Sequence, residues 1–147
     1  MTLQQWLENS WLRRHKTKPR EIKDLLQIVD RDLKDAREHH ISSDWRFGIA
    51  YNAALKLCTI LLYAEGYRSE RALQHYRTIQ AVPLILGKSR KNDAQYLDLC
   101  RSKRNIVEYD QIGTVSDQDA DELIEFCMEF KEDVLMWLNE NHPDLHQ

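Results

Sequence analysis

The segment Tyr96–Asp110 carries the side chains best suited to chemistry in this sequence. At the spacing of an α-helix, two guanidinium groups, an amide and a carboxylate gather on one side, from Arg101, Arg104, Asn105 and Glu108. Apolar side chains gather on the other, from Tyr96, Leu99, Cys100, Ile106 and Val107. The polar side has two interpretations. It is a solvated face with an Arg104–Glu108 pair worth about 0.2–0.5 kcal/mol, or a face that recognises phosphate or a partner subunit.

A basic loop, Gly87–Asn92, precedes this segment and carries Lys88, Arg90 and Lys91. With Arg101, Lys103 and Arg104 it forms the strongest local positive patch in the sequence. A nucleic-acid backbone binds to such patches, although no aromatic residues alternate with the basic ones to stack on bases. Residues 13–20 hold five more Lys and Arg residues and no acid, and are either an arm that contacts phosphates or, as we favour, a solvated linker.

Other catalytic and metal-binding patterns are missing from the sequence. There is no glycine-rich phosphate loop, zinc-protease helix motif, paired Cys/His zinc pattern or nucleophile elbow. His39 and His40 are adjacent, so on a helix their side chains point about 100° apart and do not share an ion. We therefore predict no metal and no cofactor. His75, on an expected helix, is interpreted as a core or rim histidine rather than a catalytic one.

Composition predicts one helical, cytoplasmic domain. The 147 residues suit a single domain, and only four glycines and three prolines interrupt them. The net charge of −3 does not indicate a nucleic-acid binder, and residues 117–147 hold ten Asp/Glu against one Lys. Three widely spaced cysteines indicate buried, reduced thiols. No signal peptide is visible, and the most apolar run, Ala53–Ala64, is too short to span a membrane.

Apolar spacing and capping residues place the helices. We expect a short helix capped by Thr2, one from Pro19 to about His39, one from a Ser43 cap to Gly66, and one from Ser69 that kinks at Pro83. The helix Tyr96–Asp110 follows, and a last one runs from Ser116 to Asn141. No strand alternation is visible. The prediction is an all-α up-and-down bundle of four to five main helices plus a short N-terminal helix. Its parts are residues 1–18 (helix and basic linker), 19–141 (bundle) and 142–147 (frayed tail).

Two segments resemble the HEPN domain family, small helical proteins of prokaryotic defence and toxin–antitoxin systems. AYNAALKLCTILLYAEGYR (Ala50–Arg68) resembles the family's long helix that ends in Gly-Tyr-Arg, and RNIVEYD (Arg104–Asp110) resembles its signature of Arg, often Asn, and a later His. Over about residues 43–140 the resemblance implies a HEPN-like bundle. Tyr109 stands at the family's histidine position. The tyrosine that some members carry two residues later is Gln111 here, so Tyr109 does not inherit its role as a nucleotide-modified residue.

The resemblance implies a homodimer with two arginine-bearing helices across a two-fold cleft, and metal-independent cleavage of RNA. Arg104 would stabilise the charge on the scissile phosphate, with Asn105 orienting it. Tyr109 is a poor base at neutral pH, since its reference pKa is about 10, but it can donate a hydrogen bond or proton, and Glu108 is the alternative base. Two facing copies would also let Arg104 pair with the Glu108 of the second copy.

Three functions follow from these observations. The first is a HEPN-type ribonuclease, such as a toxin. The second is a catalytically inactive dimer that binds nucleotide, nucleic acid or a protein partner, namely a nucleotidyltransferase or an antitoxin. The third is an interaction domain that uses the acidic C-terminal helix.

Overall fold

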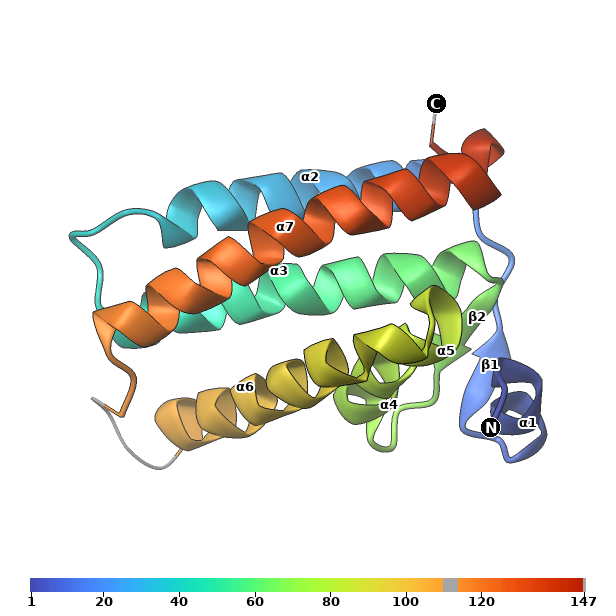
Figure 1. Ribbon diagram of the computed structural model, residues 1–147, viewed down its shortest axis with the longest axis horizontal. Coiled ribbons are helices and arrows are strands. Elements are labelled where there is room, and N and C mark those ends of the chain that lie inside the picture. Colours follow the sequence, from blue (N-terminus) through green and yellow to red (C-terminus); the bar gives the residue numbers. More distant parts are fainter. Residues whose placement is uncertain (110–113, 147) are drawn as a thin grey trace.

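Four long helices form the body of the protein, as the sequence predicts for an all-α bundle (Figure 1). They are α2 (Pro19–Ala36), α3 (Ser43–Ala64), α6 (Lys91–Tyr109) and α7 (Asp117–Asn141). Along the chain, each of these helices runs antiparallel to the one before it (Figure 1). The computed structural model describes residues 1–109 and 114–146, without the side chains of 107–109.

Local capping explains where the long helices begin and end. Pro19 occupies the first turn of α2, where its missing N–H costs no hydrogen bond. Ser116 and Asp119 bond reciprocally at the start of α7, as the sequence predicts. The cap of α3 is Ser42 rather than the predicted Ser43. After α3, Gly66 has φ +87°, which a glycine adopts without strain and which turns the chain into the next element.

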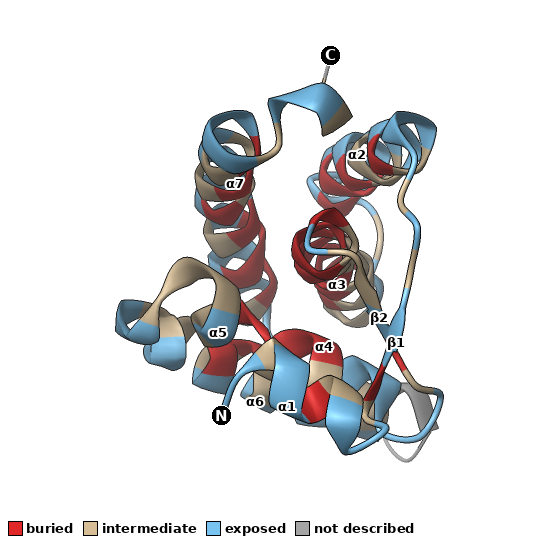
Figure 2. Ribbon diagram, turned by 90° about the vertical axis from the view of Figure 1, so that its right-hand side faces the viewer, coloured by how far each residue is buried: buried red, intermediate tan, exposed pale blue. Residues whose placement is uncertain are grey.

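The central helix is α3, which packs against α2, α6 and α7 (Figure 2). Its core side chains include Ala50, Leu57 and Ile60, each 0% exposed. By length and composition α3 could cross a membrane. However, 67% of its apolar stretch is buried inside the bundle, as in the core helix of a globular protein. Cys58, Cys100 and Cys127 are buried free thiols, which confirms that prediction, and burial raises the pKa of Cys100 to about 11.

The N-terminal segment is not a simple linker, and this corrects two predictions. After helix α1 (Leu3–Glu8), strand β1 (Leu12–Arg14) pairs antiparallel with strand β2 (Tyr67–Ser69). Ser69 therefore ends a strand instead of starting a helix. The ribbon is two-stranded and only three residues long, too short to show an alternating pattern. A second apolar cluster of Trp6, Leu12, Leu62 and Ala81 attaches this segment to the bundle.

The fourth helix is interrupted next to Pro83, as predicted, and forms α4 (Gln74–Gln80) and α5 (Val82–Leu86), but it starts at Gln74 rather than at Ser69. Leu73 precedes α4 with φ 55°, a left-handed conformation that strains a branched side chain. A 3-10 turn, η1 (Lys88–Arg90), leads into α6, and a second, η2 (Pro143–Leu145), follows α7.

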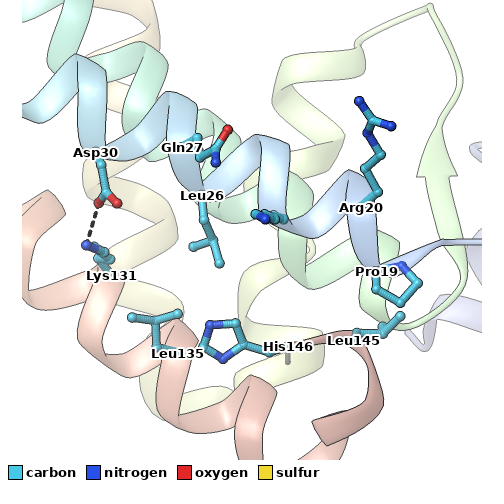
Figure 3. Close-up of a pocket in the computed structure, with 10 residues that line it drawn as sticks. Pro19, Arg20, Leu26, Gln27, Asp30, Lys131, Leu135, Leu145 and His146 are labelled. Carbon is cyan, nitrogen blue, oxygen red and sulfur yellow. Dashed lines mark hydrogen bonds and ion pairs between the residues drawn. The ribbon is translucent and has the colours of Figure 1, made fainter.

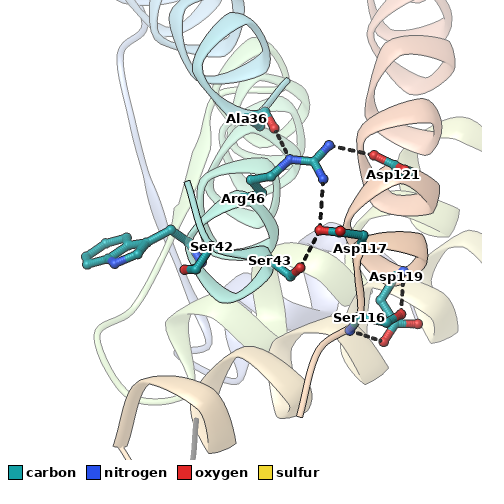
Figure 4. A network of polar contacts seen from close by, with 9 residues as sticks. Ala36, Ser42, Ser43, Arg46, Ser116, Asp117, Asp119 and Asp121 are labelled. Atoms are coloured by element: carbon teal, nitrogen blue, oxygen red, sulfur yellow. Dashed lines mark hydrogen bonds and ion pairs between the residues drawn. The ribbon is translucent and has the colours of Figure 1, made fainter. Parts of the chain in front are cut away.

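A buried arginine joins three helix ends at the far end of the bundle (Figure 4). Arg46 of α3 is 1% exposed, and its Nε donates to the carbonyl of Ala36 at the end of α2 over 2.8 Å. Its two terminal nitrogens form ion pairs with Asp117 and Asp121 at the start of α7. Ser43 donates to Asp117 as well, and this bond and Arg46 lower the pKa of that carboxyl.

Candidate functional site

Helix α6 is rotated relative to the predicted orientation. Leu99 and Ile106, assigned to its apolar side, are 70% and 43% exposed, whereas Leu97 is 1% exposed. The physical reason is that α6 is covered from two directions. Tyr96 and Cys100 face α7, while the next arc of the helix, which carries Arg101 and Arg104, faces α3 and α4. The two arginines therefore do not lie opposite the core, as predicted, but line its edge.

Arg101 and Arg104 each lie over a tyrosine ring from another helix. The Arg104 Cζ is 5.6 Å from the ring centroid of Tyr51, a residue of α3 that is only 1% exposed. The Arg101 Cζ is 5.6 Å from the ring centroid of Tyr76 on α4. Such cation–π contacts are favourable and orient the guanidinium groups. Arg101 is further fixed by Asp98 of its own helix, at 2.9 Å.

His75 of α4 completes this cluster. Its ring centroid is 6.3 Å from that of Tyr51. His75 is an exposed residue, but desolvation of its imidazole lowers the pKa, and the positive charges of Arg104, Lys56 and Arg101 lower it further. The imidazole is therefore neutral at neutral pH and can accept a proton. The neutral imidazole on α4 is thus under the electrostatic influence of three cations, which α3 and α6 carry.

Tyr51 has a polar atom without a visible purpose in the packing. Burial raises the pKa of its hydroxyl, so the phenol stays protonated. The hydroxyl oxygen is buried and has no hydrogen-bond partner among the described residues. A buried unpaired hydroxyl is uncommon and costs stability, so it is a group that a ligand or an ordered water would satisfy.

The arrangement suits acid–base chemistry on an anion. A neutral imidazole accepts a proton, and adjacent guanidinium groups stabilise negative charge as it develops. Within the described part of the chain, no group of three or more His, Cys, Asp or Glu residues is positioned to hold a metal ion.

The structure does not unite the predicted basic patch. Arg90 forms ion pairs with Asp93 and with Asp133 of α7, which raise its pKa, and Lys103 pairs with Asp119 of α7. The charges of both are thus largely compensated by the acidic helix. Lys88 and Lys91 are exposed at the start of α6. Of the predicted nucleic-acid residues, Arg101 alone lies in the cluster with Arg104.

The remaining predicted catalytic residues are Asn105, Glu108 and Tyr109. Asn105 is half-buried on α6, next to Arg104. The side chains of Glu108 and Tyr109 lie outside the described residues. Sequence reasoning did not assign His75, Tyr51 or Lys56 to the site. The hydroxyl of Tyr51 on the mostly apolar helix α3 was one signal in the sequence. The packing of α4 against α3 and α6 is not visible in residue spacing.

A larger pocket of about 540 Å³ lies between α2, α7 and the C-terminal turn (Figure 3). Its floor is apolar, from Leu26, Leu135 and Leu145. Lys131 is neutralised by Asp30, and His146 bonds to Asn139 at 2.7 Å. Since these polar groups already have partners, this pocket is a weaker candidate for chemistry than the His75 cluster.

Comparisons of the chain with protein-family models, curated proteins and solved structures give no match.

Proposed function

We propose that the chain is a HEPN-like ribonuclease that cleaves RNA without a metal, with His75 and Arg104 as its catalytic residues. One observation carries the proposal. His75, whose pKa is lowered, lies beside Tyr51 under the positive field of Arg104, Lys56 and Arg101. In this proposal His75 of α4 provides the base. The resemblance would place a histidine base at the position that Tyr109 occupies in this sequence.

The chemistry follows from these groups. His75 takes the proton of a ribose 2′-hydroxyl, whose oxygen attacks the adjacent phosphorus. A phosphorus–oxygen bond forms to the 2′-oxygen and the bond to the 5′-oxygen breaks, giving a 2′,3′-cyclic phosphate. Arg104 stabilises the extra negative charge on the phosphate in the transition state. The leaving 5′-oxygen takes a proton from the imidazolium or from water, and the products are the cyclic phosphate and a 5′-hydroxyl.

A homodimer is part of the same proposal. Leu99 and Ile106 lie seven residues apart and are both exposed on the outward side of α6. This position next to Arg101 and Arg104 supports a second copy that covers the apolar side chains and encloses the basic cluster. Light scattering at micromolar concentration tests this: a dimer is expected, and Leu99→Glu should shift it to a monomer.

The test of activity is cleavage of a mixed, labelled RNA pool in EDTA. We expect His75→Gln and Arg104→Gln to lower the rate by at least about a hundredfold, as loss of a positioned base or oxyanion-stabilising group does. His40→Gln is the matched control, because His40 is exposed and lies in the α2–α3 connection, outside the cluster around His75. A wild-type protein that leaves RNA intact, or equal rates for all variants, would contradict the proposal.

The second candidate is a catalytically inactive HEPN-like dimer that binds nucleotide, nucleic acid or a nucleotidyltransferase or antitoxin partner. It is favoured by the ring of Tyr76, which is 37% exposed beneath Arg101 and offers a surface for stacking a base. In this case wild-type protein binds short single-stranded RNA in fluorescence anisotropy without cleaving it. Arg101→Gln and Tyr76→Ala then weaken binding.

A further inference from the structure

A separate polar pocket of about 230 Å³ lies where the end of α3, strand β2 and the start of α4 meet. Arginine, glutamine and hydroxyl side chains line most of it, from Thr59, Arg68, Ser69, Arg71, Gln74 and Thr78. It does not include His75, Arg101 or Arg104, so it is distinct from the candidate active site.

Both arginines of this pocket are exposed, and neither has an acidic partner among the described residues. Neither Arg68 nor Arg71 forms an ion pair or side-chain hydrogen bond with any described residue. The adjacent acid, Glu70, is already held by Arg13 at 3.1 Å. Arg13 and Arg68 also stand directly opposite each other in the β-ribbon. Like charges in that position destabilise a strand pair. Glu70 compensates Arg13, so among the described residues it is Arg68 whose charge stays uncompensated.

A pair of buried hydroxyls lies next to these arginines. Ser69 Oγ and Thr78 Oγ1 are 2.9 Å apart, and the two residues are 9% and 5% exposed. Their mutual bond uses one of the two hydroxyl protons. The other proton has no acceptor among the described residues, and an anion in the pocket would accept it.

The backbone has a strained conformation between two polar residues that line the pocket. Leu73, with φ 55°, lies between Arg71 and Gln74, and its side chain is 61% exposed. A left-handed leucine costs roughly 1–2 kcal/mol, and burial of this exposed side chain does not explain the cost. The turn places Arg71 and Gln74 on the same pocket.

We propose that this pocket binds a phosphate group, with Arg68 and Arg71 as its charge partners and Gln74 and the Ser69–Thr78 pair as hydrogen-bond donors. Guanidinium groups match the geometry of phosphate oxygens. The volume is below the roughly 300–1,000 Å³ of pockets for drug-sized ligands. It accommodates a phosphate group, while an attached nucleoside lies outside.

Calorimetric titration with inorganic phosphate tests the site on the full chain. We expect saturable binding to wild type that is at least tenfold weaker in the Arg68→Gln/Arg71→Gln double variant. Arg20→Gln/Arg37→Gln is the control, because it removes the same charge from exposed arginines of the α2 region and should bind as wild type does. No saturable binding by wild type, or equal loss in both double variants, would overturn the proposal.

A second pair of titrations identifies the source of the phosphate. A 5′-phosphorylated 2′-O-methyl RNA tetranucleotide, which lacks the attacking 2′-hydroxyl and is not cleaved, is compared with the same oligonucleotide bearing a 5′-hydroxyl. At least tenfold tighter binding of the phosphorylated form, lost in the Arg68→Gln/Arg71→Gln variant, assigns the pocket to an RNA terminus. Equal binding of both oligonucleotides, with inorganic phosphate still bound, assigns it to a free anion. Neither result depends on RNA cleavage, so the His75 proposal and this one stand or fall separately.

Discussion

Substitution of Arg46 by methionine tests the junction that holds three helix ends together. Methionine keeps much of the side-chain volume but leaves the carbonyl of Ala36 without its charged donor at 2.8 Å. Ala36 is 0% exposed, so water does not replace that bond readily. Loss of a hydrogen bond to a charged group, with a buried acceptor left unpaired, costs about 1.5–3 kcal/mol. Asp117 and Asp121 have side chains 75% and 56% exposed, so they stay hydrated and add little.

We therefore expect Arg46→Met to lower the free energy of unfolding by about 1.5–3 kcal/mol. With a slope of about 2 kcal/mol per molar urea, the unfolding midpoint falls by about 0.8–1.5 M. The control is Arg20→Met, which removes an exposed arginine 3.9 Å from Asp24 and should leave the midpoint nearly unchanged. A loss in Arg46→Met no larger than in this control, or a gain in stability, would refute the assignment of Arg46 as the junction.

Two further predictions concern His75 and Leu73. Because its pKa is lowered, His75 binds a proton more weakly in the folded state than in the unfolded chain. Protonation of His75 therefore lowers the free energy of unfolding as the pH falls below about 6.5, and has no effect on it above that pH. Arg104→Gln should raise the pKa of His75 in an NMR titration of its ring proton. An unchanged pKa would show that the charge of Arg104 does not act on His75. Leu73→Gly should stabilise the fold by about 0.5–1 kcal/mol in urea unfolding, because the relief of left-handed strain exceeds the added chain entropy; a clear loss of stability would contradict this reasoning.

The long helices were predictable because their signals are local. The N-terminal proline of α2, the Ser116–Asp119 cap of α7 and the apolar character of α3 each appear within a few residues of sequence. The polar contacts of α3 depend instead on its neighbours: the amide of Asn52 donates to Asp32 of α2 at 2.6 Å.

The ribbon and the candidate site were not predictable in the same way. Strand β1 exists because Leu12–Arg14 finds a partner more than fifty residues away, which no local pattern indicates. The orientation of α6 depends on two neighbours at once, so a helical wheel placed Leu99 inside although it is 70% exposed. For the same reason the electrostatic effect of Arg104 on His75 required the packed structure.

The most direct test of the central claim compares His75 with Tyr109 as the catalytic group. Single-turnover cleavage of one defined RNA in EDTA is measured for wild type, His75→Gln, Arg104→Gln and Tyr109→Phe. We predict that Tyr109→Phe cleaves at nearly the wild-type rate to a 2′,3′-cyclic phosphate, while His75→Gln and Arg104→Gln lose at least about a hundredfold. Full activity in His75→Gln together with its loss in Tyr109→Phe would contradict the account and return the chemistry to Tyr109.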